Sequence, residues 1–175
     1  SVTKLEDPVG KTLQKTELDK GLILEKISVP IGVIACIFES RPEVVVQISA
    51  LAIKSGNAVL LKGGSEALNT NRALVEIIRK SITDNKGMPV DAVQLLETRE
   101  AVREVLKMDD FIDLIIPRGS NKFVKYIQDN TKIPVLGHSE GICHVYVDKD
   151  ADMGKAVRIC FDSKFQYAAV CNAME

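Results

Sequence analysis

The sequence contains no tryptophan and few aromatic residues, and its charges nearly cancel. Only 5% of the 175 residues are aromatic, and 23 Lys and Arg stand against 24 Asp and Glu, for a formal net charge of −1 at pH 7. Proteins that bind phosphodiester backbones or anionic lipid surfaces gather Lys and Arg on one face or segment. The balanced charge therefore argues against nucleic acid and membrane surfaces as partners.

Long hydrophobic runs are also missing. No apolar stretch approaches the roughly 20 residues that a membrane-spanning helix needs. The opening segment SVTKLEDPVGK lacks the apolar core of a secretory signal. We therefore expect a cytoplasmic protein that forms one globular domain with short additions.

Cysteine and histidine are scarce. The sequence has four cysteines and two histidines, without a CxxC pair or a Cys/His cluster that could surround a metal ion. We expect neither a metal site nor a disulfide framework. Cys36 and Cys143 fall in strand-like segments and Cys160 falls on an apolar helix face, so we interpret these three as structural.

Short apolar segments recur along the chain, and helical patterns separate most of them. These strand candidates are residues 32–38, 57–61, 92–95, 111–116, 133–136 and 142–147. Such runs are typical of strands that are covered on both faces. Their alternation with helices predicts a Rossmann-like α/β fold, with an open, mostly parallel sheet flanked by helices.

Capping residues mark the expected helix starts. Ser40 and Glu43 have capping-box spacing, and the apolar face that follows ends at Gly56. Further helices are expected to begin at Ser65, near Thr98, after Gly119 and Ser120, and near Asp152. In the last helix we expect Met153, Ala156, Val157 and Cys160 to face inward.

Both ends of the chain differ from this pattern. The polar residues 1–20 include Asp7, Pro8 and Gly10 and are interpreted as a connecting arm. At residues 171–175 a helix-forming pattern begins, and the sequence stops within its first turn. We therefore expect a fragment of a larger, two-domain protein.

Two strand-to-helix turns are candidate ligand sites. One contains Lys62, Gly63, Gly64 and Ser65, and the other contains Gly119 and Ser120. In an open α/β sheet, ligands bind beyond the carboxyl ends of the strands, where free N–H groups at helix starts attract phosphate. Either turn alone could be simple turn geometry. Together they favour a dinucleotide or another phosphorylated ligand, although no GxGxxG fingerprint is present.

Cys171 is the candidate nucleophile, because it stands at a helix start. Unpaired N–H donors there lower a thiol pKa and can hold an oxyanion, whereas the alternative is a core thiol beside Val170. Arg41, Arg118 and His138 lie in turns near the proposed ligand sites. Each could contact an anionic substrate or be an ordinary solvated residue.

Several segments together resemble a known family. FESRP, LLKGGSEA, IDLIIPRGS, PVLGHSEGICHVYVD and CNAME are similar to the gamma-glutamyl phosphate reductases of the aldehyde dehydrogenase superfamily, and to the reductase half of bifunctional pyrroline-carboxylate synthases. The resemblance runs from about residue 21 to residue 175. It implies a connecting arm at 1–20, an NADP-binding α/β domain at 21–166, and the start of a catalytic domain at 167–175.

The resemblance also implies an activity. Family members reduce gamma-glutamyl phosphate with NADPH to glutamate gamma-semialdehyde and release phosphate, on the route to proline. It implies glutamate kinase as a partner, homo-oligomers at full length, and a mitochondrial location if the chain belongs to a eukaryotic bifunctional enzyme. Since the family continues well beyond residue 175, we expect these residues alone to bind nucleotide weakly and to turn over poorly.

Roles are carried over position by position. Cys171 matches the family nucleophile, which would form a thioester, and Lys62 matches the lysine that contacts the adenosine ribose. Gly119 and Ser120 match the pyrophosphate-binding helix start. Ser40, Arg41, His138 and Asn172 are candidate oxyanion or substrate contacts, with Ser40 aligned to the asparagine that assists the oxyanion elsewhere in the superfamily.

Two departures from the wider superfamily bear on the reaction. Val135 stands where aldehyde-oxidising members carry a glutamate base, so nothing there can activate water. Ser65 replaces the glutamate that holds the ribose hydroxyls in NAD-using relatives, which leaves room for the extra phosphate of NADPH. The alternatives are a non-catalytic nucleotide-binding module, or a reductase of another acyl phosphate such as aspartyl phosphate.

Overall fold

The computed structural model describes residues 2–39, 41–85, 87–137, 141–168, 170 and 172–174. Its contacts divide the chain into two compact units, residues 1–138 and residues 139–175, which are treated separately below. None of the helices in the described ranges combines the length and the apolarity that crossing a bilayer requires.

The first unit begins with a hairpin. After a 3-10 turn at Val2–Lys4, strand β1 (Thr12–Asp19) pairs antiparallel with β2 (Leu22–Ile27). Residues 1–20, expected to be a connecting arm, thus contain a strand that the sequence did not predict, and the boundary at residue 20 falls inside the hairpin turn. Polarity suggested an arm because both strands are exposed along almost their whole length, so no apolar face separates them from a solvated loop.

A four-stranded parallel sheet forms the body of the first unit, as the sequence predicts. Its strands are β3 (Val33–Ile37), β4 (Ala58–Lys62), β5 (Val93–Leu95) and β6 (Leu114–Pro117), in the order β5-β4-β3-β6. The chain moves outward from β3 to β5 and then crosses to the other side of β3. This reversal places a topological switch point between β3 and β6, where α/β folds bind ligands.

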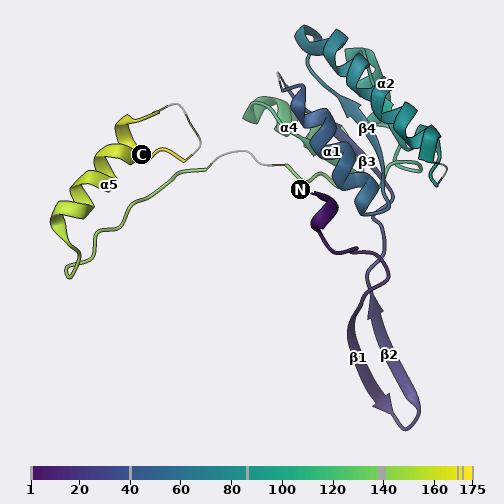
Figure 1. The fold of residues 1–175 in the computed structure, drawn as a ribbon, viewed down its shortest axis with the longest axis horizontal. Coiled ribbons are helices and arrows are strands. Elements are labelled where there is room, and N and C mark those ends of the chain that lie inside the picture. Colours follow the sequence, from purple (N-terminus) through teal and green to yellow (C-terminus); the bar gives the residue numbers. More distant parts are fainter. Residues whose placement is uncertain are drawn as a thin grey trace. The chain divides into compact units, whose positions relative to one another are not determined.

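Helices cover both faces of the sheet. They are α1 (Glu43–Lys54), α2 (Leu68–Asn85), α3 (Arg99–Val105) and α4 (Asn121–Asp129), with 3-10 turns at Ser65–Ala67 and Val90–Ala92. One apolar core packs α1 and α2 against β3, β4 and β5, and a second packs α3 and α4 against the opposite face. Figure 1 shows α1 and α2 lying along the same face of β3 and β4.

Local sequence signals explain the helix boundaries. The Thr98 hydroxyl accepts a hydrogen bond from the Ala101 N–H at 3.1 Å, and Ser120 caps α4 through the Phe123 N–H. Gly56 follows α1 with a φ of +71°, a left-handed conformation that glycine adopts without a steric penalty. The capping box expected at Ser40 lies outside the described residues.

Two predicted strands do not form in the described residues. Residues 133–136 contribute one parallel bridge, between Val135 and Ile115, and residues 142–147 contribute one bridge, between Cys143 and Met174. The strand predicted from residue 111 begins only at Leu114. Apolar composition alone does not make a strand, because a strand also needs a partner with free backbone groups beside it.

The second unit contains one helix among its described residues, α5 (Met153–Phe165), which Asp152 caps as predicted. The expectation that its apolar face points inward is wrong for the described chain. No residue of α5 is buried, and Met153 and Val157 are each 62% exposed. Residues 139–175 offer no further helix or strand in the described part against which α5 could pack.

Candidate functional site

Lys62 ends β4 and lies at the centre of the first candidate turn. Its side chain is buried, with 8% of its surface exposed, and its ammonium donates a hydrogen bond to the Gly63 carbonyl. Burial lowers the pKa of Lys62, the positive charge of Arg99 lowers it further, and the carboxylate of Glu66 partly opposes both effects. A buried cation with so few acceptors is suited to bind an anionic or hydroxyl-rich ligand.

The two glycines after Lys62 differ in their surroundings. A Cβ on Gly63 would lie 2.1 Å from Nδ2 of Asn71 and 3.1 Å from the ring of Phe38. A Cβ on Gly64 would meet only the carboxylate of Glu66, the mobile end of an exposed side chain. Gly63 therefore allows the turn to approach α2 closely, which no larger residue permits.

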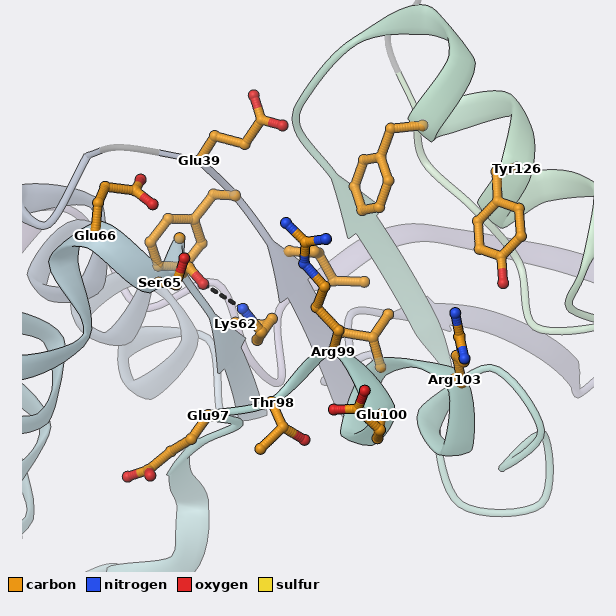
Figure 2. Close-up of a pocket in the computed structure, with 16 residues that line it drawn as sticks. Glu39, Lys62, Ser65, Glu66, Glu97, Thr98, Arg99, Glu100, Arg103 and Tyr126 are labelled. Carbon is orange, nitrogen blue, oxygen red and sulfur yellow. Dashed lines mark hydrogen bonds between the residues drawn. The ribbon is translucent and has the colours of Figure 1, made fainter.

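A cavity of about 720 Å³ opens beside this turn. The residues that line it come from the ends of β3 and β4, from the start of α3 and from α4: Ile37, Phe38, Glu39, Lys62, Gly63, Gly64, Ser65, Glu66, Glu97, Thr98, Arg99, Glu100, Val102, Arg103, Phe123 and Tyr126. Figure 2 shows Lys62 and Ser65 on one side of this space and Tyr126 on the other. The lining combines charged and polar side chains with aromatic and aliphatic ones.

The turn after β5 forms the floor of the cavity. The Glu97 carboxylate accepts two hydrogen bonds from the Arg72 guanidinium, at 3.0 and 2.8 Å, and this pairing lowers the pKa of Glu97. The Leu96 N–H donates to the Leu61 carbonyl at 2.8 Å. These bonds fix the turn to α2 and β4, so that Thr98 and Arg99 begin α3 at the edge of the cavity.

Residues 37–39 form a wall that the first cavity shares with a second. The Phe38 N–H donates to the Lys62 carbonyl at 2.9 Å, and the Arg118 N–H donates to the Ile37 carbonyl at 2.7 Å. The second cavity, of about 580 Å³, lies at the switch point between β3 and β6, and Arg41, Arg118 and Gly119 line it. The exit of β3 is thus bonded to the strands on both sides.

The predicted site residues lie in different parts of the chain. Lys62, Gly63, Gly64 and Ser65 line the first cavity, and Arg41 and Gly119 line the second. Ser120 caps α4 between Gly119 and the cavity-lining Phe123. Asn172 is exposed in the separate second unit. The candidates Ser40, His138 and Cys171 lie outside the described residues.

The α3 and α4 wall of the first cavity was not predicted from the sequence. Thr98 was recognised as a helix start, but the turn that it follows was not recognised as part of a ligand site. The strand order was the missing information, because only the neighbouring positions of β4 and β5 bring Arg99 beside Lys62. In the described ranges, no group of three or more His, Cys, Asp or Glu side chains could hold a metal ion.

Comparisons with known proteins agree with the fold. A family model described as "Aldehyde dehydrogenase family" matches residues 3–175. Gamma-glutamyl phosphate reductase of Methanococcoides burtonii is 62% identical over 174 residues, which are 99% of this chain and 39% of that protein. The enzyme of the same name from Pelotomaculum thermopropionicum is 64% identical over 175 residues, 100% of this chain and 40% of that protein.

A solved structure gives the same result. The crystal structure of gamma-glutamyl phosphate reductase from Thermotoga maritima aligns with a TM-score of 0.91 at 40% identity, covering 99% of this chain and 42% of that one. The chain thus spans about 40% of the length of the relatives that it matches.

Proposed function

Because the chain belongs to the aldehyde dehydrogenase family, whose members use nicotinamide cofactors, we propose that it is the NADPH-binding part of a gamma-glutamyl phosphate reductase. The whole enzyme reduces gamma-glutamyl phosphate to glutamate gamma-semialdehyde, releases phosphate, and serves proline biosynthesis. Relatives that carry this name are 58–64% identical over nearly the entire chain.

One observation supports the cofactor assignment. A buried lysine, Lys62, and the adjacent glycine turn line a cavity at the carboxyl ends of the strands. A volume of about 720 Å³ lies within the range of roughly 300–1,000 Å³ typical of ligand pockets. Lys62 supplies charge and hydrogen-bond donors, and the α4 wall supplies apolar surface. These residues fit a nucleotide, which has a polar ribose and a flat base.

The cofactor contacts divide along the sheet. We place the adenosine ribose at Lys62 and Ser65, where Gly63 and Gly64 let the ligand approach the backbone. We place the pyrophosphate at Gly119 and Ser120, because α4 begins there and directs the positive end of its dipole toward that turn. Ser65 occupies the position that favours NADPH, since a hydroxyl can donate a hydrogen bond to an additional phosphate that a carboxylate would repel.

Cys171 is the proposed nucleophile. Its thiolate attacks the carbonyl carbon of the acyl phosphate, phosphate leaves with the electrons of the broken C–O bond, and the acyl group remains on sulfur as a thioester. The bound cofactor supplies the hydride that reduces this thioester, after which the aldehyde leaves and the thiolate is restored. Arg41, His138 and Asn172 are proposed substrate contacts, and Ser40 is a proposed oxyanion contact.

Val135 favours reduction over oxidation. It bridges to Ile115 beside β6 and packs against the second apolar core, and it carries no group that could deprotonate water. Since this position offers no base to activate water, it gives no route to hydrolysis of a thioester. The missing base thus supports the reductase over an aldehyde-oxidising enzyme.

The test uses the complete reductase that contains this segment. Cys171→Ser is expected to abolish turnover while NADPH still binds, measured by a steady-state assay and by calorimetric titration. Cys160→Ser, on an exposed helix, is the matched control and should keep full activity. Normal turnover by Cys171→Ser would overturn the role of Cys171 as the nucleophile.

Thiol reactivity gives a second, independent readout. Cys171 is expected to react with iodoacetamide faster than Cys36, Cys143 and Cys160, because a catalytic thiol has a lowered pKa. Burial raises the pKa of Cys36 to about 11, so Cys36 should be the slowest of the four. Peptide mass spectrometry after timed alkylation ranks the four thiols, and a slow Cys171 would argue against its role.

We also propose a partner enzyme, an oligomeric state and a location for the complete reductase. A kinase that phosphorylates the glutamate side chain must supply the substrate, because acyl phosphates hydrolyse in water. We propose glutamate kinase for this role, a homo-oligomeric state for the complete enzyme, and the cytoplasm as its location. Co-purification with the kinase and size-exclusion chromatography of the complete enzyme test the first two points.

A further inference from the structure

Two cations line the same cavity, and no carboxylate among the described residues forms an ion pair with either. Lys62 comes from the end of β4 and Arg99 from the start of α3, and both line the cavity of about 720 Å³. Figure 2 shows the guanidinium of Arg99 directed toward the side where Lys62 and Ser65 lie. Within the described ranges, no hydrogen bond or ion pair joins Arg99 to another residue.

The acidic residues of the cavity do not neutralise this pair by direct contact. Glu97 is occupied by the two hydrogen bonds from Arg72. Glu66 lies over Gly64, and its charge partly offsets the lowering of the Lys62 pKa. Glu39 and Glu100 also line the cavity, and neither forms an ion pair with Arg99. Two like charges therefore face one space, and the repulsion from Arg99 adds to the effect of burial, which is the main cause of the lowered pKa of Lys62.

We propose that Arg99 is a specificity residue that binds the phosphate monoester on the adenosine ribose of the cofactor. This inference rests on the proposed function. A dianionic phosphate relieves the repulsion between Lys62 and Arg99, and a guanidinium can donate two parallel hydrogen bonds to it. Lys62 then contacts the ribose, and Ser65 donates a hydrogen bond to the phosphate. Arg99 binds the phosphate from the α3 side.

One residue of the cavity, Glu66, would favour NADH over NADPH. Glu66 is placed beside Gly64, where its carboxylate could accept hydrogen bonds from ribose hydroxyls and repel a phosphate. Selection between the two cofactors is thus a competition between Arg99 and Glu66. We assign the larger effect to Arg99, because it carries a full positive charge with no partner in the described chain.

The experiment compares Arg99→Gln with Arg103→Gln in the complete reductase that contains this segment. Both residues are exposed arginines of α3 that line the same cavity. Figure 2 shows Arg103 on the far side, near Tyr126. NADPH, NADH and adenosine 2′,5′-bisphosphate are titrated calorimetrically, and circular dichroism confirms that each variant is folded.

Arg99→Gln should weaken NADPH and adenosine 2′,5′-bisphosphate by about tenfold or more, the usual effect of one charge-assisted hydrogen bond. NADH should change by less than about twofold, and Arg103→Gln should leave the NADPH to NADH ratio unchanged. An unchanged ratio in Arg99→Gln overturns the inference and leaves the proposed function standing. A parent enzyme that binds neither dinucleotide overturns the proposed function, and the inference with it.

Discussion

Replacement of Gly63 by alanine is the sharpest test of the close approach between the β4 turn and α2. The new methyl group would stand 2.1 Å from Nδ2 of Asn71 and 3.1 Å from Cε2 of Phe38. Both neighbours are held in place, because Asn71 is 1% exposed and Phe38 is 5% exposed. Neither side chain can move aside without disturbing the core between β3 and α2.

The size of the effect follows from this rigidity. Extra carbon atoms in a packed interior usually cost about 1–3 kcal/mol, because neighbouring side chains are forced from their preferred rotamers. We expect Gly63→Ala to lower the free energy of unfolding by about 2 kcal/mol, within that range. Gly64→Ala is the matched control, because only the mobile carboxylate of Glu66 must shift there. Its effect should stay below about 0.5 kcal/mol.

Urea denaturation followed by circular dichroism measures both variants. The double variant Gly63→Ala/Asn71→Ala should recover part of the loss, since it removes the atom that clashes. Coupling energies between contacting residues are about 0.5–3 kcal/mol, large enough to be resolved in such a cycle. Equal stabilities of Gly63→Ala and Gly64→Ala, or strict additivity in the double variant, would refute the steric argument.

Three further predictions concern stability. Thr98→Ala removes the cap that accepts the Ala101 N–H and should lower the free energy of unfolding by about 1 kcal/mol, measured in urea. Leu61→Ala empties a fully buried position in β4 and should cost about 2–5 kcal/mol in the same assay. Burial raises the pKa of Cys36 from 9.0 to about 11, so the unfolded chain loses this proton first as the pH rises. Between pH 8 and pH 10 the parent chain should therefore lose about 1 kcal/mol more stability than Cys36→Ala, and equal losses in parallel titrations would contradict the burial of this thiol.

Local signals predicted the sheet body well. The runs that became β3, β4 and β5 are short, apolar and bounded by turn residues, and the caps at Thr98, Ser120 and Asp152 were confirmed. Each of these features depends on neighbours in sequence, because a cap or a buried strand is specified within a few residues. The turn that delivers Lys62 could therefore be found without a structure.

The failures all depend on partners that are distant in sequence. The strand within residues 1–20 was missed because a hairpin exposed on both faces has no polarity pattern. Residues 142–147 were taken for a strand, although only Cys143 finds a bridge partner in the described chain. Arg99 was missed because its place beside Lys62 follows from strand order, which a single sequence does not specify.

The exit of β3 has a consequence for how this protein can change. Phe38 is bonded to the end of β4, Ile37 is bonded to the segment after β6, and together with Glu39 they wall two cavities at once. A substitution there that widens one cavity reshapes the other, so the two binding spaces cannot be redesigned separately through these three positions. Substitutions on α3 can alter one cavity alone, because Arg103 borders the first cavity and not the second.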